Sequence, residues 1–387
     1  MTVLLSQKMF FMEKGGEMIK SKHLKWVVAV AIISCCISMA IPATNVLAKD
    51  KAQRWVGQAF CGRSLSIFEA IDHLTYLIDK YTDGRLKVEC KQAGELVPAG
   101  QVFDAASQGI IDFGHGCPCL ARSRAYGAQL YCDAPGGQSP IEELIWYYNA
   151  GGKELLEEIY EKKYNAHPIA VCTYSSEVWL YSNKEIKTVE DLKGLKMRCA
   201  GLRGEVLQSM GASVVVLPGG EIVPAMERGV IDAMEYGNLH ITYNVGFNDV
   251  TKYLYYHPYK ATSVLNLWAV NLDKWNELPD DVKKEVEKAS KDAVFHSLTW
   301  HIEQDLLAMK KAVEIKHNEV RLLPEEVARA VDEASADFYY KKAKEDKYTA
   351  RILESWAKFK KEYGAYAKWL DYLNMTGDHL GLVKGDS

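Results

Sequence analysis

Residues 195–236, LKMRCAGLRGEVLQSMGASVVVLPGGEIVPAMERGVIDAMEY, decide the fold of this chain. Short apolar segments alternate here with amphipathic segments of about ten residues, a pattern typical of α/β proteins in which helices join the strands of a sheet. Arg198 falls at the end of the first expected strand, whereas Glu235 and Tyr236 directly follow the last one. The stretch therefore predicts an anion-binding arginine, with a Glu-Tyr pair that caps the bound anion.

The same alternation of strands and helices extends upstream. Apolar residues at helical spacing predict a helix over 67–81 between strands at 53–59 and 86–90, and such a unit implies a parallel sheet. The next expected elements are a helix at 101–107, a buried strand at 109–114 before a loop with His115, helices within 141–164, strands at 168–173 and 178–183, and a helical turn at 188–193. Within the opening stretch we expect strands at 195–198, 212–217 and 230–234 and helices at 201–210 and 220–228. The fold class is α/β.

The chain is too long for one hydrophobic core, because 387 residues exceed the size at which chains usually divide into domains. Its composition, 48% hydrophobic and 25% charged, is typical of a soluble globular protein. From Pro279 onward the pattern is mainly that of charged helices. We expect these C-terminal helices to brace the domains and to carry no chemistry.

The N-terminus predicts an export signal. Lysines at positions 20, 22 and 25 precede an uncharged apolar run at 26–40, and small residues at 46–48 offer a cleavage site. Met18 fits the true start, because residues 1–17 include two glutamates and match no part of a signal. We therefore expect residues 1–48 to be removed and the protein to reside in the periplasm.

Two alternatives to a cleaved signal would keep the protein on a membrane. A retained transmembrane anchor needs an uninterrupted apolar segment, and Pro42 with the polar residues after it argues against one. A lipid anchor on Cys35 or Cys36 needs a lipobox, and the residues before Cys35 fit that motif poorly.

The charge of the exported chain excludes one class of partner. Removing the 5 lysines and 2 acidic residues of positions 1–48 from 47 basic and 51 acidic residues leaves 42 and 49, a net charge of −7. The sequence also has no long basic run, so nucleic acid is not an expected partner. An acidic protein that binds anions must do so with local groups.

Seven cysteines follow the signal: Cys61, Cys90, Cys117, Cys119, Cys132, Cys172 and Cys199. An exported protein can form disulfides, but an odd number leaves at least one thiol unpaired, and spacing alone does not give the connectivity. The pair around Pro118 lacks the CxxC spacing of thioredoxin-type sites, and no second Cys/His pair at zinc spacing accompanies it. We interpret Cys117 and Cys119 as small buried hydrophobic residues.

An ordered series of motifs resembles one family along nearly the whole exported chain. The motifs are KMR at 196–198, GEVL at 204–207, MGA at 210–212, LPGGEI at 217–222 and RGVIDA at 228–233, with GRL at 84–86 and GIID at 109–112 upstream and the segments 246–253 and 270–279 downstream. The chain resembles the DctP-type solute-binding proteins of TRAP transporters, which are tripartite, ATP-independent systems for extracytoplasmic solutes. The series is far more specific than any one motif.

The resemblance implies a two-lobed, periplasmic-binding-protein-like fold of type II, with hinge strands between the lobes. Residues 49–173 would form lobe I, residues 174–260 would form lobe II with the main ligand contacts, and residues 261–387 would return a strand to lobe I and add the C-terminal helices. The resemblance also implies partners in the membrane permease subunits of a TRAP transporter. Some relatives pair through swapped C-terminal helices, so a homodimer is a further expectation.

The branch that this chain resembles most binds 2-oxo acids and lactate, and it can hold a metal ion beside the bound carboxylate. In that branch the arginine of the KMR motif holds the substrate carboxylate, which implies this role for Arg198. The acid and the aromatic residue after the VIDA motif, here Glu235 and Tyr236, would line the same cleft. Glu177 falls where family members place another substrate or metal contact.

The chemistry of these residues agrees with the roles that the resemblance implies. A guanidinium offers paired planar donors that match a carboxylate, so one arginine can fix both its position and its orientation. The alternative for Arg198 is an ion pair with a neighbour such as Asp191. Two acids near one pocket, Glu177 and Glu235, favour a metal ion, a polyol or an amino group over a dianionic substrate, and the alternative for Glu177 is a solvated residue on a loop. Together with Arg198 they narrow the expected solute to a small hydroxy or oxo monocarboxylate.

Glu235 needs its own explanation, because a carboxylate beside a bound carboxylate is repulsive. A hard cation, Na⁺ or Ca²⁺, would remove the repulsion by taking oxygen ligands from Glu235, from the carbonyl of Tyr236, from Glu177 and from the substrate. Alternatively, Glu235 accepts a hydrogen bond from a hydroxyl group of the ligand. No other cofactor is expected.

Other residues of the region could complete the pocket. Aromatic side chains could form its apolar walls, and the candidates are Trp179 together with Tyr174, Trp55 and Tyr236. Asn238, two residues past Tyr236, could supply a polar contact. The histidines at 115, 240 and 257 lack spaced partners, so they are weak candidates for ligands.

Two other function classes compete with transport. An enzyme is not supported, because the sequence has no GxSxG, HExxH, Walker or dinucleotide motif, and a thiol pair of Cys117 and His115 lacks a third orienting group. A sensor subunit that presents its ligand to a membrane receptor or kinase would use the same pocket. The sequence does not separate that alternative from transport.

Overall fold

The computed structural model describes residues 52–132, 134–258 and 264–373. The expected export signal, residues 1–48, lies outside the described residues, as do its alternatives. Within the described residues, no helix has both the length and the apolar character needed to cross a membrane.

One sheet has the strand order β2-β1-β3-β10-β4. Its strands are β1 Gln53–Ala59, β2 Leu86–Lys91, β3 Phe113–Gly116, β4 Ala166–Cys172 and β10 Asn266–Asn271. As expected, β1 and β2 are parallel and are joined by helix α2, Ile67–Tyr81, whose apolar face is buried against them. Strand β10 lies antiparallel between β3 and β4. A late segment of the chain thus returns to the sheet formed by the N-terminal half.

The second sheet has the order β11-β9-β5-β8-β6-β7 and contains the opening stretch. Its strands are β5 Leu180–Ser182, β6 Lys196–Arg198, β7 Ser213–Val215, β8 Ala233–Met234, β9 Tyr253–Tyr256 and β11 Glu319–Leu322. Strand β6 is parallel to β7 and β8, and the connecting helices are α6, Gly201–Ser209, and α7, Gly219–Glu227. Arg198 pairs with Met234, so Glu235 is the first residue beyond that pair.

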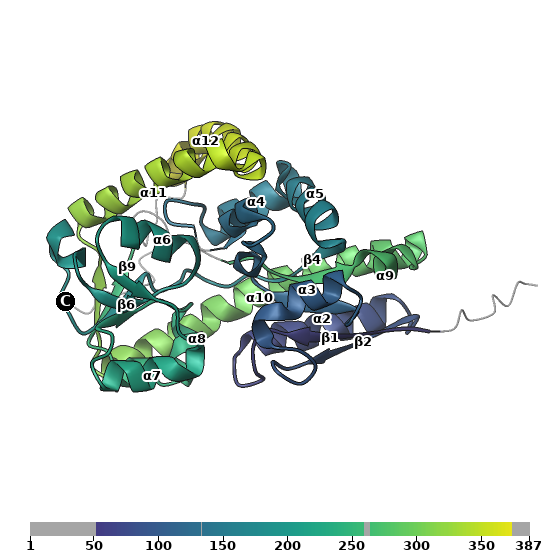
Figure 1. The fold of residues 1–387 in the computed structure, drawn as a ribbon, viewed down its shortest axis with the longest axis horizontal. Helices are drawn as coiled ribbons and strands as arrows, with labels where there is room; N and C mark the ends of the chain where they lie inside the picture. Colours follow the sequence, from purple (N-terminus) through teal and green to yellow (C-terminus); the bar gives the residue numbers. More distant parts are fainter. Residues whose placement is uncertain (1–51, 133, 259–263, 374–387) are drawn as a thin grey trace, which may run out of the picture. The chain divides into compact units, whose positions relative to one another are not determined.

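Helix α10, Asp280–Glu314, contacts segments that belong to both sheets (Figure 1). Ser290 Oγ donates a hydrogen bond to the carbonyl of Ala170 in β4, at 2.6 Å. Further along the helix, Ala308 and Ala312 belong to the apolar cluster under β5 and β8. One continuous helix therefore connects the two cores.

The remaining helices complete these cores. They are α3 Val102–Ser107, α4 Pro140–Asn149, α5 Gly152–Tyr164, α8 Leu239–Asn244, α9 Leu272–Asn276, α11 Glu325–Glu345 and α12 Lys347–Leu373. The short 3-10 helices are η1 Ala99–Gln101, η2 Pro118–Ala121, η3 Tyr126–Tyr131, η4 Val189–Leu192 and η5 Phe247–Asp249. Val331 of α11 packs in the core of the second sheet, and Trp356 of α12 packs on Trp146 of α4. The C-terminal helices brace the two cores as expected.

Two local expectations are wrong. The strand expected at 109–114 is β3, Phe113–Gly116, and residues 109–112 form the turn before it, so His115 lies inside the strand, fully buried and paired with Trp268, and is not in a loop. Strand β11 lies in a segment that the sequence assigns to charged helices. The reason is that β11 is an edge strand of only four residues, held by β9, and its Glu-Val-Arg-Leu alternation is too short to stand out between charged helical segments.

Candidate functional site

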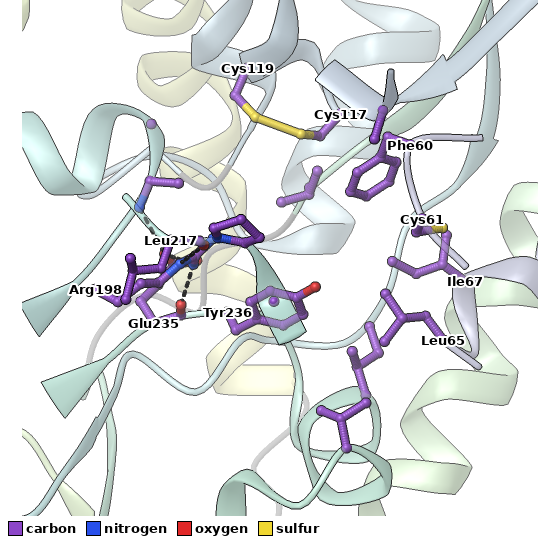
Figure 2. Close-up of a pocket in the computed structure, with 18 of the residues that line it drawn as sticks. Phe60, Cys61, Leu65, Ile67, Cys117, Cys119, Arg198, Leu217, Glu235 and Tyr236 are labelled. Carbon is purple, nitrogen blue, oxygen red and sulfur yellow. Dashed lines mark hydrogen bonds and ion pairs between the residues drawn. A yellow bond between two sulfur atoms is a disulfide. The ribbon is translucent and has the colours of Figure 1, made fainter. Parts of the chain in front are cut away.

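A cavity of about 720 Å³ lies where the connections of the first sheet meet the strand ends of the second (Figure 2). Five of the candidate ligand contacts that the sequence singles out line it: Tyr174, Glu177, Arg198, Glu235 and Tyr236. The cavity also has an apolar wall that includes Phe60, Leu65 and Ile67. A small ligand with one charged end and an apolar body fits such a lining.

Arg198 is fixed by the strand ends around it. Its Nη1 forms an ion pair with Glu235 Oε2 at 3.2 Å and also donates to the carbonyl of Glu235, while Nε donates to the carbonyl of Leu217 at 3.2 Å. The guanidinium carbon lies 5.1 Å from the centre of the Tyr236 ring. Nη2 has no hydrogen-bond partner among the described residues, so this nitrogen can donate to a ligand in the cavity.

Glu235 is held through one of its two carboxylate oxygens. Oε2 accepts hydrogen bonds from Arg198, from the amide of Ala200 at 3.3 Å and from Cys199 Sγ at 3.5 Å. Within the part of the chain that the structure describes, Oε1 accepts none. The carboxylate is therefore positioned by the protein and keeps one oxygen available for a cation or for a ligand hydroxyl.

Glu177 has a buried arginine partner, Arg203, for which the sequence motifs predict no role. Arg203 Nη2 lies 3.4 Å from Glu177 Oε2, and the two side chains are 0% and 2% exposed. Arg203 Nη1 donates to the carbonyl of Trp179 at 2.9 Å, and the Tyr174 hydroxyl donates to Glu177 Oε1 at 3.0 Å. The sequence signal was an arginine on the apolar face of α6, beside Leu202 and Val206.

Tyr236 packs tightly in the cavity wall. Its ring meets Phe247 edge-on at 5.2 Å, and burial raises the pKa of its hydroxyl. A Cβ atom added at Gly219 would lie 2.5 Å from the Tyr236 hydroxyl oxygen. The glycine that begins α7 thus makes room for this side chain.

Trp179 and Asn238 lie beside the cavity and do not line it in the described structure. Trp179 is 3% exposed and packs in the core of the second sheet, where its carbonyl holds Arg203. Asn238 caps helix α8: its Oδ1 accepts from the amide of Ile241 at 3.1 Å, and its Nδ2 donates to Ser175 Oγ at 2.9 Å. Both residues hold the backbone next to site residues.

Three further candidates are placed by the structure. Tyr174 lines the cavity, whereas Trp55 is buried in the core of the first sheet. Asp191 accepts from the amides of Lys187 and Thr188, both at 2.8 Å, and the ion pair of Arg198 is with Glu235. Asn266, at the start of β10, also lines the cavity, and no motif marks it because it lies in an apolar strand.

The interpretation of Cys117 and Cys119 as buried hydrophobic residues is wrong. The two residues are joined by a disulfide, are only half-buried and line the cavity (Figure 2). Their Cα atoms lie 5.4 Å apart, within the range that a disulfide can bridge. The sequence offered only the odd number of cysteines and a spacing that belongs to no familiar motif.

A buried carboxyl group supports the backbone behind the site. Asp305 of α10 accepts hydrogen bonds from Ser175 Oγ and from the amide of His240, the latter at 2.7 Å. Burial raises the pKa of Asp305 from its ordinary value of 3.8 to about 6, against the lowering effect of these two bonds. Ser175 lies between β4 and β5, so Asp305 ties α10 to the segment that links the two sheets.

Comparison with known proteins identifies the protein family to which the chain is similar. Residues 60–346 match the family model DctP, described as bacterial extracellular solute-binding protein, family 7. The chain is 30% identical over 342 residues to the monocarboxylate 2-oxoacid-binding periplasmic protein all3028 of Nostoc sp., which covers 87% of this chain and 91% of the relative.

Two solved structures are also similar. A TRAP transporter solute-binding protein from Bordetella bronchiseptica, a dimer with copurified calcium and picolinate, has a TM-score of 0.78 and 27% identity over 84% of this chain and 98% of its own. A TRAP periplasmic solute-binding protein from Pseudoalteromonas atlantica with bound sodium and pyruvate has a TM-score of 0.78 and 28% identity over 84% and 99%. These similarities confirm the expected two-lobed α/β fold, and the chain belongs to the DctP family of bacterial extracellular solute-binding proteins.

Proposed function

We propose that this protein is the periplasmic receptor of a TRAP transporter and binds a 2-oxo or 2-hydroxy monocarboxylate together with Na⁺ or Ca²⁺. The observation that carries the proposal is the Arg198–Glu235 pair at the ends of adjacent strands, with Nη2 and Oε1 left for a ligand. The relatives support it, because they bind 2-oxo acids or small carboxylates, two of them beside a cation.

The carboxylate would bind at Arg198. Glu235 already pairs with Nη1 at 3.2 Å, and Nη2 of the same guanidinium can donate to one oxygen of the ligand. The ring of Tyr236 lies beside the guanidinium and restricts the directions from which a carboxylate can reach Arg198. These contacts would hold the carboxylate in one orientation and present the 2-oxo or 2-hydroxy oxygen to the Glu235 side.

The cation would occupy the space beside Glu235. Its oxygen ligands would be Glu235 Oε1, the carbonyl of Tyr236, Glu177 and two oxygens of the substrate, a set that suits Na⁺ or Ca²⁺. A cation there removes the repulsion between Glu235 and the bound carboxylate. If the ligand is a 2-hydroxy acid, its hydroxyl can instead donate to Glu235.

The charge pattern favours a monocarboxylate. Arg203 is fully buried and already pairs with Glu177, so it would not bind a second carboxylate of the ligand. Beyond Arg198, the wall that includes Phe60, Leu65 and Ile67 is apolar. A second negative charge on the ligand would therefore be desolvated without compensation.

We further propose how the protein works in transport. Residues 49–173 with the strand returned by residues 261–387 would form lobe I, and residues 174–260 would form lobe II. Closure of the two lobes would bury the ligand for delivery to the membrane permease subunits, and the ligand must bind the closed form more tightly to shift that equilibrium. No catalysis is needed for this role, and residues 1–48 would direct export and then be cleaved.

Titration calorimetry with pyruvate and lactate tests the proposal. Arg198→Ala should weaken binding at least tenfold, by about 1.4 kcal/mol or more, whereas Arg228→Ala, an exposed arginine at the end of α7, should bind like the wild type. Removal of Na⁺ and Ca²⁺ should also weaken binding. Equal affinity in Arg198→Ala and wild type would refute the carboxylate site, and equal affinity after chelation in sodium-free buffer would refute the cation.

A further inference from the structure

The sulfur atoms of three cysteines lie close together on one wall of the cavity. Cys117 and Cys119 lie directly after β3, where η2 begins, and Cys132 directly follows η3. Their three Sγ atoms lie within 4.8 Å of one another, and all three residues line the cavity. This wall comes from the connections of the first sheet, whereas Arg198, Glu235 and Tyr236 come from the second (Figure 2). The sulfur wall is thus separate from the residues that would bind the carboxylate.

We propose that reduction of the Cys117–Cys119 disulfide creates a three-thiolate site for a thiophilic divalent metal ion of the zinc type. The reductant is a dithiol, which is oxidised to its own disulfide while Cys117 and Cys119 become thiols. The metal ion then forms three metal–sulfur bonds and displaces the three thiol protons to solvent. The fourth coordination position faces the cavity and is open to water or to a ligand atom.

The spacing of the sulfur atoms fits such an ion. Zinc–sulfur bonds of about 2.3 Å in a tetrahedral site place the sulfur atoms about 3.8 Å apart. The three Sγ atoms already lie within 4.8 Å of one another, so small side-chain movements bring them to that distance. The backbone of Cys132 is held by a β-bridge to Val264 and by a 2.9 Å hydrogen bond from its amide to the carbonyl of Gln129. A fixed third ligand lowers the entropy cost of closing the site.

The three cysteine sulfur atoms prefer a different class of metal ion from the oxygen ligands proposed on the other side of the cavity. Thiolates prefer soft and borderline ions such as Zn²⁺ and Cd²⁺, whereas Glu177, Glu235 and a backbone carbonyl suit Na⁺ or Ca²⁺. The sulfur site also depends on the redox state, because the disulfide offers no thiolate at positions 117 and 119. The inference does not rest on the proposed carboxylate function.

Cadmium titration of the exported protein tests the site, because thiolate-to-cadmium charge transfer gives an ultraviolet absorption that carboxylates do not produce. After reduction with a dithiol and its removal, the wild type should bind one Cd²⁺ with this absorption. Cys132→Ser should weaken Cd²⁺ binding at least about tenfold. The matched control is Cys61→Ser, another cysteine of the cavity wall outside the cluster, which should bind like the wild type.

Two further measurements keep the test decisive. In the oxidised wild type the absorption should be absent, and Glu235→Gln should leave it unchanged in the reduced protein. If Cys132→Ser does not fold, alkylation of the reduced wild type with and without Cd²⁺, read by mass spectrometry, should show protection of Cys117, Cys119 and Cys132 together. Equal Cd²⁺ affinity in folded Cys132→Ser and wild type, or no protection of these three cysteines, would overturn the proposal.

Discussion

Arg203 neutralises Glu177 inside the protein, with Nη2 and Oε2 3.4 Å apart and side chains that are 0% and 2% exposed. The pair connects helix α6 to the segment between β4 and β5, next to the cavity that Glu177 lines. Only Glu235 of the two acidic site residues is therefore left beside Arg198. Without Arg203, the two carboxylates would exceed the single guanidinium of Arg198 by one negative charge, and with Arg203 the charges of the four side chains balance.

Breaking this pair should destabilise the protein strongly. Arg203→Leu leaves the Glu177 carboxylate buried without its arginine, and such changes cost about 3–5 kcal/mol. The double variant Arg203→Leu/Glu177→Leu should recover most of that loss, because no uncompensated charge remains. Urea unfolding of both variants measures the difference. A double variant no more stable than Arg203→Leu would show that the pair is not the cause.

Loss of the Glu235 charge should uncouple carboxylate binding from the cation. Glu235→Gln keeps an oxygen that can accept from Arg198 and from the amide of Ala200, but it removes the negative charge that would hold Na⁺ or Ca²⁺. We expect pyruvate affinity to become independent of Na⁺ and Ca²⁺ in the variant. Calorimetry at several cation concentrations measures this dependence, and an unchanged cation dependence in Glu235→Gln would contradict the proposed ligand set.

The fold could be predicted where a residue pattern fits only one kind of secondary structure. Residues 53–59 and 67–81 show clear strand and helix periodicity, and the structure has these elements with the same bounds. Strand β6 ends at Arg198, and strand β8 ends directly before Glu235, as the sequence predicts. The pairing of these two strands brings the two residues together. The placement of the two residues at neighbouring strand ends could therefore be predicted from the sequence, whereas their roles in the site came from the family resemblance.

The other features of the site depend on contacts between segments that are distant in the sequence. Local residue patterns do not reveal such contacts. Arg203 looked like an ordinary helical residue because its partner, Glu177, lies 26 positions earlier. Asn238 looked like a ligand contact, but its amide caps α8 and bonds to Ser175. The disulfide was missed because two half-buried cysteines around a proline show no periodicity.

Gly219 should be required for the position of Tyr236. In Gly219→Ala the new Cβ would lie 2.5 Å from the Tyr236 hydroxyl oxygen, so the ring must move and carboxylate affinity should fall by about fivefold or more, equal to about 1 kcal/mol. The neighbouring Gly220→Ala is a matched control, because its Cβ meets no atom within 4 Å and alanine favours the helix by up to about 1 kcal/mol. Equal affinity of the two variants in calorimetry would show that Tyr236 does not need this space.

Asp305 should make the protein less stable as the pH rises through weakly acidic values. Its pKa is raised by burial from 3.8 to about 6, so between these values the folded protein binds the proton more tightly than the unfolded chain. The stabilising contribution is complete below about pH 4 and is lost as the pH passes about 6, by about 1–3 kcal/mol in total. Asp305→Asn mimics the protonated form and should lack this loss, whereas Glu303→Gln, an exposed residue of the same helix, should keep it. Urea unfolding from pH 4 to pH 7 measures all three proteins. A wild type and an Asp305→Asn variant with parallel pH profiles would show that this carboxyl group does not titrate in that range.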